Sequence, residues 1–120
     1  VGCANDQIIK TVVFTTPDGV AVVGVANGTG RIDRAKLAAA AGVSKLRLAD
    51  PALVLERTGY PAGGVSPIGI RDSSVRVFVD PAVMDQEFVL GGAGTEDDLI
   101  RLTPDQLIKY SGGTLTNITS

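Results

Sequence analysis

Lys10 is the residue of this sequence whose surroundings most favour chemistry. It interrupts an apolar, β-branched segment, with Ile8 and Ile9 before it and Val12 and Val13 shortly after, and such a segment predicts a buried strand. Burying an unpaired ammonium group is costly, so the Lys10 side chain must reach solvent or point into a polar pocket. An edge-strand lysine that discourages aggregation would have the same spacing, and the residues alone leave both interpretations open.

A second candidate is the stretch 59–69, which reads Gly-Tyr-Pro-Ala-Gly-Gly-Val-Ser-Pro-Ile-Gly and carries no charge. Glycine lets a ligand approach the backbone closely, and proline stiffens the rest of the loop. A bent, rigid, apolar loop suits a pocket wall lined with backbone N–H groups. A buried connection with several tight turns would have the same composition, so this alternative also stays open.

Two further features are weaker signals. A second glycine-rich loop at 91–98 could supply backbone N–H donors, but neither loop has the spacing of a phosphate-binding P-loop or of a dinucleotide-binding fingerprint. Five cations cluster around the first expected helix, and they form either a local RNA-binding patch or an ordinary solvated face: Arg31, Arg34, Lys36, Lys45 and Arg47.

Composition excludes several kinds of catalysis. The 120 residues contain no histidine and one cysteine, which excludes a histidine-based triad, a Cys–His dyad and an ordinary zinc site within this chain. The single cysteine rules out an internal disulfide framework and favours a cytoplasmic setting. A net charge of −2 argues against bulk electrostatic binding of nucleic acid. Apolar runs are too short for a membrane span, and no signal peptide opens the chain.

The pattern of elements predicts one mixed α/β domain over residues 1–120, with a sheet of six or seven short strands and three or four flanking helices. Strands are expected at 8–15, 20–25, 45–48, 75–79, 87–90, 99–102 and 114–118. Helices are expected at 34–41, from 51 to Gly59, in a short piece after Pro81, and from 104 towards Tyr110. Asp33, Asp50, Asp80 and the Thr103–Gln106 capping box mark their starts.

Taken together, five segments in register resemble the YbaK/EbsC family of aminoacyl-tRNA deacylases, which are related to the editing insertion of bacterial prolyl-tRNA synthetases. These segments are Ile9-Lys10-Thr11-Val12-Val13-Phe14, 33–37, Leu48-Ala49-Asp50-Pro51, Thr58-Gly59-Tyr60 and Gly63-Gly64-Val65-Ser66-Pro67-Ile68-Gly69. The resemblance covers nearly the whole chain and implies a barrel-like mixed sheet.

The resemblance also implies an activity, the hydrolysis of the ester in a mischarged aminoacyl-tRNA, with Lys10 as the residue most needed. Its substrate would be a small amino acid such as cysteine, alanine or serine on tRNA for proline. Neither metal, cofactor, DNA nor membrane is implied, and prolyl-tRNA synthetase is a candidate partner. The expected substrate-binding residues are Thr11, Gly63, Gly64, Val65, Ser66, Pro67, Leu90, Gly91, Gly92 and Asp98.

Three departures from the family pattern bear on this interpretation. The family has some thirty further residues before the position of Val1, so we expect this chain to lack an N-terminal segment. Leu90 stands where thiol-selective relatives carry serine, and the acidic residue after the second loop falls at Asp97 or Asp98. A noncatalytic tRNA- or synthetase-binding module of the same fold is therefore the alternative function, and a stable globular remnant is a third interpretation.

Overall fold

A long antiparallel hairpin forms the centre of the fold. Strands β1 (Ile9–Thr15) and β2 (Ala21–Asn27) pair along seven residues, from Ile9 opposite Asn27 to Thr15 opposite Ala21. The turn between them contains Gly19 at a φ of 92°, a conformation that glycine adopts without steric cost. The predicted hairpin is therefore confirmed.

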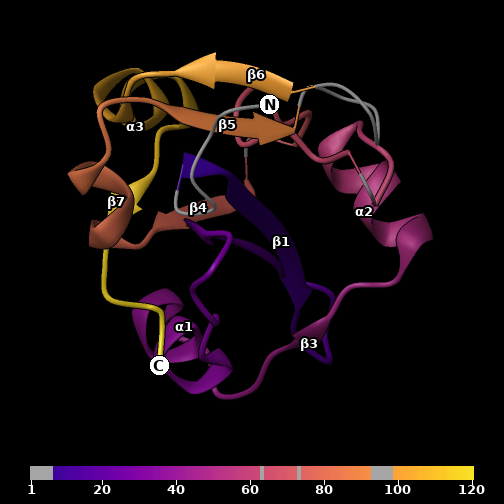
Figure 1. Cartoon of the computed structure of the whole chain (residues 1–120). Helices are drawn as coiled ribbons and strands as arrows, with labels where there is room; N and C mark the ends of the chain where they lie inside the picture. Colours follow the sequence, from indigo (N-terminus) through magenta and orange to yellow (C-terminus); the bar gives the residue numbers. More distant parts are fainter. Residues whose placement is uncertain (1–6, 63, 73, 93–98) are drawn as a thin grey trace.

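The architecture comes from a computed structural model that describes residues 7–62, 64–72, 74–92 and 99–120. Its main sheet has five strands in the order β3-β1-β2-β4-β7, with β3 at Arg47–Leu48, β4 at Arg76–Val79 and β7 at Thr114–Leu115. A second sheet pairs β5 (Val89–Gly92) with β6 (Leu99–Leu102) and crosses one end of the hairpin (Figure 1). An isolated parallel bridge from Ile8 to Leu90 joins the two sheets.

The mixed α/β class is confirmed, but the sheet is not closed into the expected barrel. The β1–β2 and β1–β3 pairs are antiparallel, whereas the β2–β4 and β4–β7 pairs are parallel. The two outer strands, β3 and β7, have only two residues each. Such short edges offer too few ladder hydrogen bonds to close a sheet on itself.

The helices begin and end where their capping residues predict. Asp33, Asp50 and Thr103 each accept hydrogen bonds from backbone N–H groups in the first turn of the helix that follows. Left-handed glycines end the same helices. The helices are α1 (Arg34–Ala41), α2 (Pro51–Thr58) and α3 (Pro104–Ser111), and a 3₁₀ helix, η2 (Pro81–Asp85), follows Asp80.

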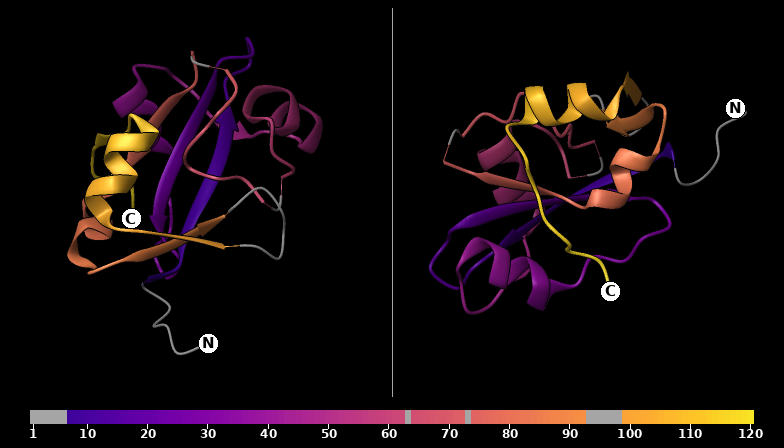
Figure 2. Two further views of the ribbon diagram at one scale, coloured as in Figure 1. Left: turned by 90° about the horizontal axis from the view of Figure 1, so that it is seen from above. Right: turned by 90° about the vertical axis from the view of Figure 1, so that its left-hand side faces the viewer.

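Two apolar clusters cover opposite faces of the main sheet. Ile9 and Val13 of β1 belong to the larger cluster, together with residues of α2, α3 and the β5–β6 pair. Phe14 belongs to the smaller cluster beneath α1, against which Val12 also packs. Figure 2 shows α1 on one side of the sheet and α3 with β5–β6 on the other. We call these the α1 side and the β5–β6 side.

Several predicted boundaries shift. The strand expected at 45–48 is limited to Arg47–Leu48, and the one expected at 114–118 to Thr114–Leu115. The strand expected at 87–90 runs instead from Val89 to Gly92, so two glycines assigned to a loop are strand residues. None of the helices in the described ranges is long and apolar enough to cross a membrane.

Candidate functional site

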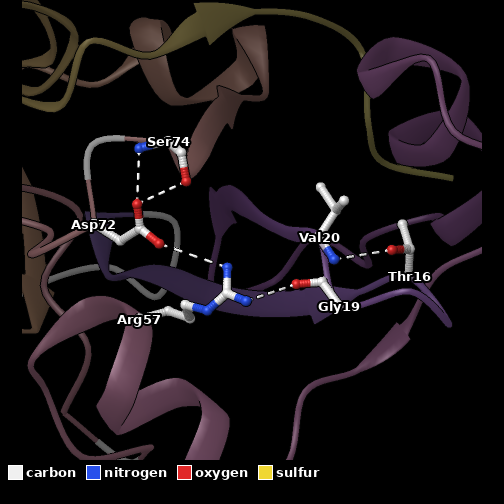
Figure 3. Close-up of polar contacts among 6 residues, drawn as sticks. All are labelled: Thr16, Gly19, Val20, Arg57, Asp72 and Ser74. Carbon is white, nitrogen blue, oxygen red and sulfur yellow. Dashed lines mark hydrogen bonds and ion pairs between the residues drawn. The ribbon is translucent and has the colours of Figure 1, made fainter.

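The glycine- and proline-rich loop is tied at its base to α2 and to the hairpin. The backbone N–H groups of Arg71 and Asp72 donate to the carbonyls of Thr58 and Arg57, at 3.1 and 3.0 Å. The Arg57 guanidinium donates to the Gly19 carbonyl at 2.9 Å and lies 3.5 Å from the Asp72 carboxylate (Figure 3). These contacts hold the two ends of the loop together beside the last turn of α2.

Asp72 is held in its charged form at this base. The Ser74 hydroxyl and N–H donate to the same carboxylate oxygen at 2.6 and 2.9 Å (Figure 3). These two hydrogen bonds, followed by the nearby charge of Arg57, lower the pKa of Asp72 from its ordinary value.

A tyrosine closes the loop a second time, further from the base. The Tyr60 hydroxyl donates to the Ile68 carbonyl at 2.9 Å, while the Tyr60 N–H donates to the Thr58 hydroxyl at 3.0 Å. Gly69 has a φ of 70°, and a Cβ there would lie 2.7 Å from the Tyr60 hydroxyl oxygen. Only glycine leaves room for this closure, which encloses residues 61–67.

Inside the closure, the residues expected to line the substrate pocket are largely buried. Gly64, Val65, Ser66 and Pro67 are buried, and Val65 packs into the larger apolar cluster. The Ser66 hydroxyl accepts a hydrogen bond from the Ile68 N–H at 3.3 Å. The alternative of a buried connection thus describes part of the loop, and Gly63 lies outside the described residues.

Glycines of β5 let the loop approach the strand closely. A Cβ at Gly92 would lie 2.5 Å from the Val65 carbonyl oxygen, and a Cβ at Gly91 would lie 3.4 Å from Pro67 and 3.2 Å from the Ile9 side chain. Side chains at these two positions would point to opposite faces of the strand. The loop backbone therefore crosses β5 at Gly92.

Lys10 lies on the face of the sheet that carries Leu90. Bridge partners share a face, so Ile8 and Leu90 point the same way, and strand alternation puts Lys10 with Ile8. The Ile8–Leu90 bridge is isolated, so β1 and β5 pair at this one point within the described residues. The Lys10 side chain is half-buried. The structure thus brings Gly92 of β5 and the Gly64–Val65 backbone together, whereas Lys10 lies on the neighbouring strand β1, on the face that carries Val12 and Phe14.

Thr11 points to the other face, into a separate cavity of about 230 Å³. Its other lining residues are mostly small or apolar: Val12, Val13, Leu48, Ala49, Val54, Ala62 and Val65. The Thr11 hydroxyl oxygen is buried and has no hydrogen-bond partner within the described part of the chain. The expected site residues therefore occupy two adjoining places, on either side of β1. Asp98 lies outside the described residues.

The five cations expected to contact tRNA are all exposed. Arg34 lies 6.0 Å from the centre of the Phe14 ring, and Lys36 donates to the Thr119 carbonyl at 2.8 Å. Phe14 is on the same face of β1 as Lys10, so α1 and Lys10 share one side of the main sheet. Arg47 is opposite Thr15 in the β1–β3 pair, which puts it on the other face.

Sequence reasoning missed the residues that hold the loop in place. Tyr60 and Arg57 were not singled out, because their partners, Ile68 and Gly19, are determined by the path of the loop. The nearest signal in the sequence was Tyr60 followed by a glycine nine residues later, because the closure needs a residue without a side chain beside the tyrosine hydroxyl.

The structure is a small mixed α/β domain in which a closed glycine loop packs against strand β5, and the chain has no histidine. The chain belongs to the aminoacyl-tRNA editing domain family, whose model matches residues 1–110.

Named relatives agree with this family. The Bacillus subtilis protein YwhH is 31% identical over 111 residues, which are 92% of this chain and 69% of YwhH. The Enterococcus faecalis protein named "Putative Cys-tRNA(Pro)/Cys-tRNA(Cys) deacylase EbsC" is 29% identical, over 99% of this chain and 72% of its own length. The proline--tRNA ligase of Maridesulfovibrio salexigens is 29% identical over 83% of this chain, which spans only 17% of the ligase.

Among solved structures, the chain is similar to one described as a "putative trans-editing enzyme for prolyl tRNA synthetase". The TM-score is 0.90 at 30% identity, and the match covers 99% of this chain and 74% of the other. The resemblance to the YbaK/EbsC family is thereby confirmed.

Proposed function

We propose that this domain hydrolyses the ester of mischarged aminoacyl-tRNA, with cysteine, alanine or serine as the amino acid and tRNA for proline as the carrier. Family membership supports aminoacyl-tRNA deacylase activity in general. The observation that supports the proposal is the close approach of the glycine-loop backbone to β5 at Gly92, beside the strand β1 that carries Lys10 and meets β5 at the Ile8–Leu90 bridge.

Such a site can work without histidine. An aminoacyl ester is already activated, and the vicinal ribose hydroxyl can assist at high effective molarity. Backbone N–H donors directed at a developing oxyanion contribute about 10²–10³ in rate. Lys10 would add a fixed positive charge near that oxygen, or anchor the terminal ribose.

The small size proposed for the substrate rests on the apolar, tightly packed loop that includes Val65 and Pro67. The cavity of about 230 Å³ at Thr11, lined mainly by alanine, valine and leucine side chains, has room for such a side chain. Leu90 supplies no hydroxyl beside Lys10, which argues against a strictly thiol-directed mechanism. Editing of this kind is needed because a synthetase pocket rejects a slightly smaller amino acid by only about 1–3 kcal/mol.

A noncatalytic tRNA- or synthetase-binding module is the second candidate. Burial of Gly64, Val65, Ser66 and Pro67 favours it, because buried N–H groups are less able to reach a substrate. Prolyl-tRNA synthetase would be the partner in either case, since its editing domain is related to this chain. The exposed cations around α1 would then contact the tRNA.

The experiment is a deacylation assay with alanyl-, seryl-, cysteinyl- and phenylalanyl-tRNA. We expect release of the small amino acids and no release of phenylalanine. Measurable tRNA binding without ester cleavage above background would favour the binding module. Efficient release of phenylalanine would contradict the proposal of a small amino acid as substrate.

A further inference from the structure

The outer face of the β5–β6 pair is a partly exposed surface that meets the start of the Lys10 strand at the Ile8–Leu90 bridge. Register places Leu90 opposite Arg101 and Gly92 opposite Leu99. Val89 and Leu102 are buried in the larger cluster, so alternation turns Leu90, Leu99 and Arg101 outwards. Leu99 is 53% exposed.

Arg101 is held in place on this face by an aromatic ring. Its guanidinium carbon lies 4.2 Å from the centre of the Phe88 ring, within the range of a cation–π contact. No carboxylate of the described residues forms an ion pair with it. The charge of Arg101 is therefore fixed in position, exposed and available to an anion.

Ile8, two residues before Lys10, and Arg101 flank the same leucine. The Ile8–Leu90 bridge and the Leu90–Arg101 pair line up β1, β5 and β6 in that order. Neighbouring strands lie about 4.8 Å apart, so the backbones at Ile8 and Arg101 are separated by about 10 Å, and Lys10, two residues further along β1, lies roughly 12 Å from Arg101. The loop backbone at Val65 borders this surface at Gly92.

We propose that Arg101, stacked on Phe88, binds a phosphate of the single-stranded 3′ end of the RNA substrate. This inference rests on the proposed function, in which the ester lies at Lys10. A cation about two strands away from the ester can reach the phosphates that precede the terminal nucleoside. Aromatic and arginine side chains occur together on surfaces that bind single-stranded nucleic acid, and here the half-buried Phe88 supports an exposed Arg101.

The test compares two substrates that share the ester and differ in phosphate. Arg101→Gln is assayed on alanyl-tRNA for proline and on 2′(3′)-O-alanyl-adenosine, which has no phosphate. We expect the KM for the tRNA to rise about three- to tenfold with kcat unchanged, and hydrolysis of alanyl-adenosine to stay at the wild-type rate. Arg101→Lys should restore much of the tRNA affinity, since it keeps the charge.

Binding of an uncharged, fluorescein-labelled RNA ending in CCA supplies a readout that needs no catalysis. Arg101→Gln should weaken this binding, and the slope of log K against log salt should become less negative by about 0.7. Arg76→Gln is the matched control, because Arg76 is also stacked on a phenylalanine, at 5.0 Å from the Phe78 ring. It should leave both readouts unchanged.

The outcomes separate the two claims. An unchanged RNA affinity and salt slope in Arg101→Gln would overturn the phosphate contact, as would an equal loss on alanyl-adenosine. If the wild-type protein cleaves neither ester, the proposed function fails, and the RNA-binding comparison still decides the role of Arg101.

Discussion

The hydroxyl of Tyr60 donates a 2.9 Å hydrogen bond to the carbonyl oxygen of Ile68, and so closes a loop over the seven residues between them. The same hydroxyl occupies the space that a side chain at Gly69 would need. A hydrogen bond between a side chain and the backbone of its own loop fixes the course of that loop without any substrate. The glycine loop is therefore pre-organised by the chain itself.

Tyr60→Phe should impair deacylation much more than it impairs folding. Losing one hydrogen bond costs about 0.5–1.5 kcal/mol of unfolding free energy, whereas a misplaced loop can reduce the rate on the order of 10²-fold. The measurements are kcat, KM and thermal unfolding. Tyr110→Phe is the control, because Tyr110 is the other tyrosine of the chain and is 56% exposed. Equal activity of the two variants would contradict the role of Tyr60.

Gly92→Ala should move the loop away from β5. The new Cβ would lie 2.5 Å from the Val65 carbonyl oxygen, which belongs to the backbone and cannot rotate away. We expect a loss of about 1–3 kcal/mol in stability and at least a tenfold drop in kcat. Gly91→Ala provides the comparison, because its nearest neighbour is the flexible end of the Ile9 side chain at 3.2 Å. Retention of full activity by Gly92→Ala would show that the close approach is dispensable.

Much of this fold could be predicted from local signals. The Asp33, Asp50 and Thr103 caps and the β-branched hairpin strands are determined by neighbouring residues, and all were predicted correctly. The open sheet was not predicted correctly, because closure of a sheet depends on how many residues of its edge strands form pairs. Gly91 and Gly92 were assigned to a loop, since glycine weakens strands in general. Here they are strand residues that allow Ile9, Pro67 and Val65 to pack closely.

The site was harder to predict than the fold. Lys10 and the glycine loop were identified from their residue types, yet sequence could not show that Thr11 faces a cavity on the other side of β1. Alternation along β1 puts Lys10 and Thr11 on opposite faces, but which elements cover each face depends on long-range contacts such as the bridge between Ile8 and Leu90. Residues 82 positions apart in the chain carry no local signal of such a contact.

Asp72→Asn should make stability less dependent on pH in acid. The pKa of Asp72 is lowered in the folded protein, chiefly by hydrogen bonds from Ser74. The unfolded state therefore binds more protons between the two pKa values, and the stabilisation is full above the unfolded pKa and is lost as pH falls through the folded pKa. Urea unfolding between neutral pH and strong acid should show a shallower decline for Asp72→Asn. A decline as steep as that of the wild type would mean that the contacts with Ser74 and Arg57 do not favour the charged form.

Charge reversal at Lys36 and Arg47 should weaken tRNA binding on the order of tenfold and flatten its salt dependence. These exposed cations are expected to supply the positive field that the net charge of −2 does not. Thermal unfolding checks the fold, because Lys36 also donates to the Thr119 carbonyl. Lys109→Glu, on α3, is the control. An unchanged salt slope, with and without prolyl-tRNA synthetase, would show that the cluster is only a solvated surface.

The central claim, that Lys10 acts on the substrate, is tested most directly by single-turnover hydrolysis of alanyl-tRNA for proline with Lys10→Ala. We expect deacylation to fall to background while the thermal unfolding temperature stays close to that of the wild type, because a half-buried surface lysine contributes little to stability. Lys10→Arg should also fail, since a planar guanidinium cannot replace a compact ammonium in a small site. Wild-type turnover by Lys10→Ala would contradict the catalytic assignment.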